Sequence, residues 1–252
     1  MKLARAPHLG FLDGDDLWLP DMLDRHLAIF EAHPGIDLTF SLSRVVDEAG
    51  AELHSMPPHR GGVVEFQELL SESPIRNGST VVVRREALER AGGFDAALSP
   101  CDDCGMWLSV ALLRPANVYC VPEVLTLYRR RPGQLTRNRA LFWTAWLRVL
   151  EKMRRLAPER VRPVEACASG YMSHRFAILA YEEGAPAEAL RFLWLSLRKA
   201  PHRRLVQPGA WLLAAACLSR RLLPAGVHHR LEAWARRRRA GRISLRGASH
   251  GA

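Results

Sequence analysis

The chain lacks any apolar segment long enough to cross a membrane. Its longest uninterrupted apolar run, Ala210 to Leu218, is far short of the roughly 20 residues that a membrane-spanning helix needs. The N-terminus also reaches the acidic cluster Asp13 to Asp16 too early to hold the apolar core of a signal peptide. We therefore expect a cytoplasmic protein without a transmembrane helix. Any membrane contact would be peripheral, at the inner face.

Cysteine is scarce, with five among 252 residues. An odd number in a chain of this size does not suggest a disulfide scaffold. Cys101 and Cys104 form a Cys-x-x-Cys pair, but a zinc site needs a second pair or histidines at ligand spacing, and Cys120 has no such partner. We expect neither a disulfide framework nor a zinc or redox centre.

Lysine is almost absent, since only three of the 36 basic residues are lysines. The formal charge is −6 over residues 1–132 and +16 over residues 133–252. Such a bias towards arginine fits either codon composition or a binding surface. No recognition motif accompanies the charge, so we expect no nucleic-acid partner.

Hydrophobic periodicity divides the chain into an α/β half and a helical half. Short apolar runs predict strands at 11–12, 36–40, 45–46, 79–83 and 118–128, and residues 51–62 have the composition of a loop. Stripes at helical spacing predict helices, the first after Pro20 with Leu23, Leu27 and Phe30 on one face. The expected domains are 1–135 (α/β), 136–235 (helical) and 236–252, a basic tail expected to be disordered.

The first candidate site is the acidic cluster of Asp13, Asp15 and Asp16, which follows an apolar run and contains Gly14. Clustered carboxylates suit Mg²⁺ or Mn²⁺ holding a diphosphate, because these cations prefer oxygen ligands. The alternative is a solvated acidic loop before the helix at Pro20.

The second candidate site is the pair Asp102 and Asp103 at the start of a helical stripe. A carboxylate held near a substrate hydroxyl can act as a general base. The alternative is a helix N-cap, a position at which aspartate is preferred.

Five segments, in this order, resemble the successive motifs of bacterial family-2 glycosyltransferases, which are inverting enzymes of the GT-A fold. The segments are Phe11 to Pro20, Asn77 to Arg85, Gly92 to Asp95, Asp102 to Leu108 and Tyr128 to Arg130. The resemblance covers about residues 4–138. It implies a partial GT-A (nucleotide-diphospho-sugar transferase-like) α/β domain, followed by an all-helical C-terminal region.

The resemblance also implies a role for each acid. Asp13 and Asp15 match the family's DxD motif, whose second acid binds the metal, and Asp16 is the additional acid that follows it. Asp103 matches the base of the family's Glu-Asp motif. Asp102 stands where the family has glutamate. Because aspartate is one methylene shorter, the resemblance leaves open how this residue holds the acceptor.

The implied reaction is metal-assisted transfer of a sugar, with inversion, from a nucleotide-sugar donor to a hydroxyl of a glycan, lipid-linked or other acceptor, as in cell-envelope polysaccharide biosynthesis. Mg²⁺ or Mn²⁺ is the implied cofactor. Arg129 and Arg130 follow the last strand of the α/β half and are candidates for contact with the donor phosphates. The alternative for both is a solvated strand end.

The chain departs from the family at its N-terminal side. Family members begin with a strand ending in a Pro-x-x-Asn-like motif and with βα units that bind the nucleotide, whereas Asp13 lies only a dozen residues after Met1. The implied missing part is on the order of 60 residues or more. Either the reading frame begins upstream, or the chain is a relic.

A non-catalytic remnant is therefore the alternative function. Its basic helical half would bind a partner protein or an anionic membrane surface, through Arg220, Arg221 and residues 236–239 beside Trp211, Leu212 and Trp234.

Overall fold

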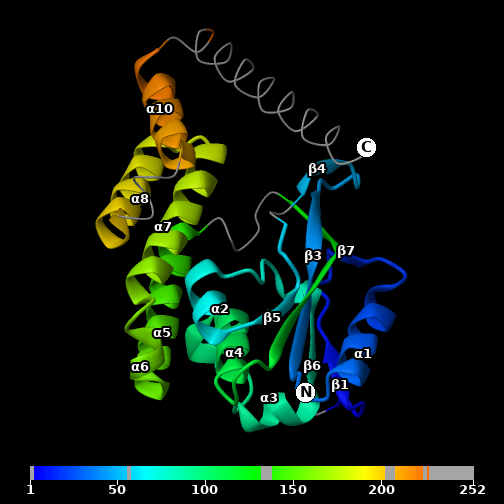
Figure 1. Ribbon diagram of the computed structural model, residues 1–252. Helices are drawn as coiled ribbons and strands as arrows, with labels where there is room; N and C mark the ends of the chain where they lie inside the picture. Colours follow the sequence, from blue (N-terminus) through cyan, green and yellow to red (C-terminus); the bar gives the residue numbers. More distant parts are fainter. Residues whose placement is uncertain (1–2, 56–57, 132–137, 202–207, 224–225, 227–252) are drawn as a thin grey trace, which may run out of the picture. The chain divides into compact units, whose positions relative to one another are not determined.

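The computed structural model describes residues 3–55, 58–131, 138–201, 208–223 and 226, and the tail expected at 236–252 lies outside them. The chain divides into two compact units, Met1–Ala168 and Ser169–Ala252. The first is a mixed α/β unit and the second is helical in its described part (Figure 1). The α/β character of the first half and the helical character of the C-terminal part are as predicted.

The first unit is built on a seven-stranded sheet with the strand order β1-β6-β3-β7-β2, to which β4 adds beside β3 and β5 beside β7. The strands are β1 (His8–Gly10), β2 (Leu17–Trp18), β3 (Leu38–Val46), β4 (Glu52–Ser55), β5 (Gly62–Val64), β6 (Val81–Arg84) and β7 (Val118–Arg129). The central strands β3 and β7 are parallel, and the other pairs are antiparallel. Leu38, Phe40, Val81 and Val118 are fully buried there.

Helices cover both faces of this sheet, with α1 on one side and α2 and α4 on the other (Figure 1). The helices of this unit are α1 (Met22–Ala32), α2 (Phe66–Glu72), α3 (Arg85–Arg90), α4 (Asp102–Ala111), α5 (Arg139–Leu156) and α6 (Pro158–Val161). Two short 3₁₀ turns, η1 (Gly78–Thr80) and η2 (Ala96–Leu98), complete it.

Helix α1 forms where predicted, and of its predicted apolar face Phe30 is buried and Leu27 packs against the same core cluster. Met22, His26 and Phe30 are its buried residues, whereas Leu23 is 45% exposed. The polar His26 turns inward because its Nδ1 lies 2.6 Å from the Thr39 hydroxyl in β3. Burial lowers the pKa of His26 to about 4, so the ring is neutral at physiological pH.

The loop predicted at 51–62 contains strand β4, and its last residue, Gly62, begins strand β5. Strand β4 forms a hairpin with β3 through a turn in which the Ala51 N–H donates to Asp47 Oδ1 and Gly50 adopts a φ of +86°. Strand β5 pairs with β7, more than fifty residues further along the chain. The strand predicted at 11–12 lies slightly earlier, at His8–Gly10.

Helix α7 (Glu165–Glu182) begins just before the second unit, which also contains α8 (Pro186–Lys199) and α10 (Pro208–Leu222). Within this unit the Ser196 hydroxyl of α8 donates to the Gly170 carbonyl of α7 at 2.6 Å. A Cβ at Gly170 would lie 2.6 Å from that of Ala200, so glycine permits this close approach. In the described part of the chain, no helix is both long and apolar enough to span a membrane.

Candidate functional site

The acidic cluster forms a tight loop between β1 and β2, which we call the carboxylate loop (residues 13–16). The Asp16 N–H donates to the Asp13 carbonyl at 3.0 Å and closes the loop. Asp13 is exposed, Asp15 is partly buried and Asp16 is only 6% exposed. The three carboxylates therefore differ in their access to a ligand.

Ser79, in the turn η1, holds this loop from a distant part of the sequence. Its hydroxyl donates to Asp16 Oδ2 at 2.6 Å and accepts the Asp13 N–H at 3.0 Å. Its carbonyl accepts the Trp18 indole N–H at 2.7 Å and the Thr126 hydroxyl at 3.3 Å. Ser79 lies in the segment Asn77 to Arg85, which resembles a family motif, but nothing in the sequence indicated that it holds the carboxylate loop.

Asp16 uses both carboxylate oxygens inside the protein, because Oδ1 accepts the Arg129 N–H at 2.9 Å while Oδ2 accepts the Ser79 hydroxyl. Burial raises the pKa of Asp16, and the charges of Asp13 and Asp15 add to the rise, whereas the two hydrogen bonds oppose it. Burial, followed by the charge of Asp15, also raises the pKa of Asp13.

The end of β7 wraps around the same loop. The Arg129 guanidinium donates to the backbone carbonyls of Asp15 at 2.9 Å and Glu48 at 2.6 Å, which ties the loop to the β3–β4 turn. The Arg130 N–H donates to the Val46 carbonyl at 2.8 Å. Contact of Arg129 and Arg130 with phosphate stays a prediction.

Arg131, which the sequence analysis did not single out, reaches the Asp15 carboxylate. Its Nε and Nη2 donate to Asp15 Oδ2 at 3.0 and 2.7 Å. The side chains are 49% exposed for Arg131 and 17% for Asp15. A run of arginines after the last strand was the one signal in the sequence that could have indicated this pair.

Asp102 and Asp103 occupy the first turn of α4, as predicted. Asp103 Oδ1 accepts the Cys104 N–H at 2.6 Å. Its Oδ2 lies beside Gly78, since a Cβ built there would be 3.9 Å away. The turn η1 therefore borders Asp103 through Gly78 and the carboxylate loop through Ser79.

An aromatic cluster connects three of the predicted motifs. Phe11 contacts Trp107 of α4 and Phe94 edge-on, with ring centroids 5.2 and 5.5 Å apart, and Phe94 lies 5.8 Å from Trp107. Phe94 follows Gly92 and Gly93, whose φ values of +90° and +75° end α3. These rings fix α4 against the segment that leads into the carboxylate loop.

The residues that would hold a divalent cation are Asp13 and Asp15. Among the described residues there is no group of three or more His, Cys, Asp or Glu side chains that could hold a metal ion. Mg²⁺ in nucleotide sites usually takes only one or two carboxylates and completes its shell with phosphates and water. The carboxylates of Asp13 and Asp15 are oxygen donors of the kind and number that this pattern uses.

Sequence comparisons give two relatives named as glycosyltransferases, and no family model matches the chain. The uncharacterized glycosyltransferase MJ1057 of Methanocaldococcus jannaschii is 26% identical over 132 residues, covering 51% of this chain and 44% of that protein. The amylovoran biosynthesis glycosyltransferase AmsE of Erwinia amylovora is 26% identical over 140 residues, 54% of this chain and 51% of AmsE. The chain spans about half the length of these relatives.

Structure comparison gives the same fold in TarS of S. aureus. A structure of TarS residues 1–349 in complex with UDP-GlcNAc matches with a TM-score of 0.52 and 14% identity, over 87% of this chain and 65% of that one. A longer TarS structure matches with a TM-score of 0.50 and 13% identity, over 87% of this chain and 39% of that one. At this identity the likeness concerns the fold alone.

Proposed function

We propose that the chain is the catalytic part of a bacterial family-2 glycosyltransferase of the GT-A fold, which transfers a sugar with inversion from a nucleotide-sugar to an acceptor hydroxyl. The observation that carries the proposal is that one turn, η1, borders both the carboxylate loop and Asp103. The names of the two relatives and the UDP-GlcNAc bound to TarS support the class of reaction and of donor.

In this proposal Asp13 and Asp15 bind Mg²⁺ or Mn²⁺, and Asp16 keeps their loop in place. The bound cation supplies Lewis-acid stabilisation of the leaving nucleoside diphosphate. Asp103 accepts the proton of the acceptor hydroxyl, whose oxygen attacks the anomeric carbon on the face opposite the leaving group, so the configuration inverts. Asp102, beside it, orients the acceptor.

The transferase domain of this proposal is residues 1–135, because these carry the motifs, and residues 136–235 are its helical companion. Since the relatives are about twice as long as the matched region, activity, donor and acceptor all belong to the proposal. The relative in amylovoran biosynthesis favours a cell-envelope polysaccharide as the product, made on the cytoplasmic side.

The test is metal-dependent nucleotide binding by the full-length protein as the gene encodes it. Asp15→Asn should abolish Mn²⁺-dependent binding of UDP or GDP in isothermal titration calorimetry, because the protein would lose the negative charge that would hold the cation. Asp21→Asn is the matched control, since Asp21 is exposed just before α1 and makes no side-chain cap. Nucleotide affinity unaffected by EDTA would contradict the proposal.

A second candidate, peripheral binding to an anionic membrane surface, is favoured by one face of α8. Arg191, Trp194 and Arg198 are three and four residues apart, so they share a face, and Trp194 is 63% exposed. We call these residues the α8 stripe. An aromatic ring flanked by arginines is the arrangement that binds at the lipid headgroup level.

A further inference from the structure

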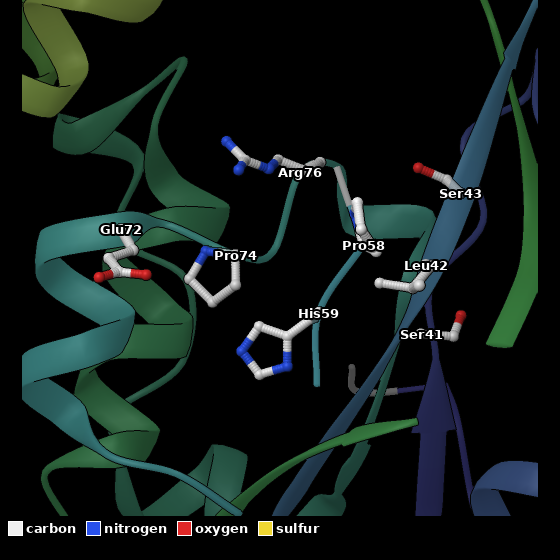
Figure 2. Close-up of a pocket in the computed structure, with 8 residues that line it drawn as sticks. All are labelled: Ser41, Leu42, Ser43, Pro58, His59, Glu72, Pro74 and Arg76. Carbon is white, nitrogen blue, oxygen red and sulfur yellow. The ribbon is translucent and has the colours of Figure 1, made fainter. Parts of the chain in front are cut away.

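A pocket of about 180 Å³ lies between β3 and the end of α2. Figure 2 shows its two walls, with β3 on one side and the end of α2 and the following segment on the other. It is lined by Ser41, Leu42, Ser43, Pro58, His59, Glu72, Pro74 and Arg76. Its volume is below the roughly 300 Å³ at which pockets for drug-sized ligands begin, so it suits a single small ring.

A short stretch of chain leads from the pocket lining to Gly78, the residue beside Asp103. Arg76 lines the pocket, Asn77 follows it, and Gly78 is the residue beside Asp103 Oδ2. Asn77 also contacts the pocket wall, because its Nδ2 donates to the Ser43 hydroxyl at 3.3 Å. Asn77 and Gly78 therefore connect the pocket lining to the neighbourhood of the candidate base along the chain.

Two buried polar atoms at this wall have no hydrogen-bond partner among the described residues, namely Ser41 Oγ and Asn77 Oδ1. Ser41 is only 3% exposed and Asn77 only 8%. Buried polar atoms are nearly always paired, because an unpaired one costs its full desolvation penalty. Both atoms can accept a hydrogen bond, and of the two residues Ser41 belongs to the pocket lining.

The wall that carries His59 is held in place before any ligand binds. The Gly61 N–H donates to His59 Nδ1 at 3.1 Å, so the proton lies on Nε2, which donates to Glu68 Oε1 at 3.0 Å. Gly61 has a φ of +78° and packs so closely on Pro122 that a Cβ would lie 2.7 Å from its ring. A preorganised wall binds with a smaller loss of conformational entropy.

The lining combines apolar and polar side chains, and a sugar ring likewise presents both C–H groups and hydroxyls. Leu42, Pro58 and Pro74 contribute apolar surface to the lining, while Glu72 and Arg76 contribute a carboxylate and a guanidinium. The two formal charges are opposite, which favours a neutral ligand over an anionic one. We infer that this pocket binds the terminal ring of a neutral saccharide acceptor and presents one of its hydroxyls to Asp103. This inference rests on the proposed function and narrows its acceptor from any hydroxyl compound to a neutral glycan.

The experiment is saturation-transfer difference NMR on the full-length protein with methyl glucoside, methyl galactoside, methyl N-acetylglucosaminide and methyl glucuronide. At least one neutral glycoside should bind, and Glu72→Gln or Arg76→Gln should weaken it by at least about tenfold, the scale of a lost hydrogen bond to a charged group. Glu65→Gln is the matched control, because Glu65 is an exposed acid next to the other end of α2 and outside the pocket. Circular dichroism checks the fold of each variant.

The outcomes separate this inference from the proposed function. If UDP binds with Mn²⁺ but no neutral glycoside binds, or the glucuronide binds best, the saccharide pocket is wrong and the transferase proposal stands. If a glycoside binds at Glu72 and Arg76 but no nucleotide binds, the pocket stands and the transferase proposal fails. Glycoside binding that survives both pocket substitutions overturns the assignment of the site.

Discussion

At the scale of single residues, the proposed function makes Asp15 the carboxylate for which a metal and Arg131 would compete. Arg131 directs two N–H groups at one Asp15 oxygen, yet half of its side chain is exposed. Ion pairs this accessible to water contribute only about 0–1 kcal/mol. A divalent cation can therefore displace the guanidinium, which then lies next to the position that the proposed function assigns to the donor phosphates.

Arg131→Gln should tighten the binding of Mn²⁺ alone by roughly two- to fivefold, because Asp15 loses its competing cation. Free Mn²⁺ measured by electron paramagnetic resonance gives the affinity without any nucleotide or turnover. Arg25→Gln is the control, since Arg25 makes a comparable exposed pair with Glu123 at 3.4 Å. Unchanged or weaker Mn²⁺ binding in the Arg131 variant would show that Arg131 does not compete for the site.

At the scale of secondary-structure elements, the start of α4 presents two adjacent acids with different surroundings. Asp103 has one oxygen on the Cys104 N–H and the other beside Gly78. Asp103→Asn should leave nucleotide binding intact and lower sugar transfer by about 10² or more, the usual scale for a lost general base. The measurements are titration calorimetry for UDP and radiolabelled transfer for turnover.

Asp102→Asn is the matched variant, because it removes the neighbouring charge from the same helical turn. It should affect acceptor KM more than turnover. If Asp102→Asn lost turnover while Asp103→Asn kept it, Asp102 would be the base and the assignment within this motif would be wrong by one residue.

Local signals in the sequence predicted the elements whose determinants are local. Helix α1 follows Pro20, α3 ends at Gly92 and Gly93, and α4 begins at its two acids. Strands β4 and β5 were missed because their partners decide them, and β5 pairs with a strand more than fifty residues away. The burial of His26 in α1 was not predicted because its contact with Thr39 has no signature in the spacing of apolar residues.

In the candidate site, too, features set by neighbouring residues could be predicted, whereas features set by distant residues could not. Carboxylates in a motif are visible in the sequence, but the partners that set their exposure are not. Ser79 bonds to Asp16 across 63 residues, and Arg131 bonds to Asp15 across 116. Only the fold could show that Asp16 is occupied by the protein while Asp13 is exposed.

At the scale of the whole molecule, charge is distributed very unevenly along the chain. Residues 1–132 carry a formal charge of −6, and residues 133–252 carry +16. A basic segment with exposed aromatic side chains is attracted to anionic lipid, and each arginine near such a surface contributes about 1 kcal/mol. The α8 stripe provides both basic charge and an exposed aromatic side chain, and Trp211, which is 53% exposed, provides a second aromatic side chain.

The double variant Arg191→Gln/Arg198→Gln should bind vesicles of phosphatidylglycerol and phosphatidylcholine roughly thirtyfold more weakly than the unmodified protein, because two favourable charges of about 1 kcal/mol each are lost. Vesicle co-sedimentation at two salt concentrations measures this, and added salt should weaken the unmodified protein more than the variant. Arg155→Gln/Arg162→Gln is the control, since both arginines are about three-quarters exposed and lie outside the second unit. Equal binding to vesicles of phosphatidylcholine alone, or an equal loss in the control, would show that the α8 stripe does not recognise an anionic surface. In that case the exposed side chain of Trp194 would have to contact something other than an anionic lipid surface.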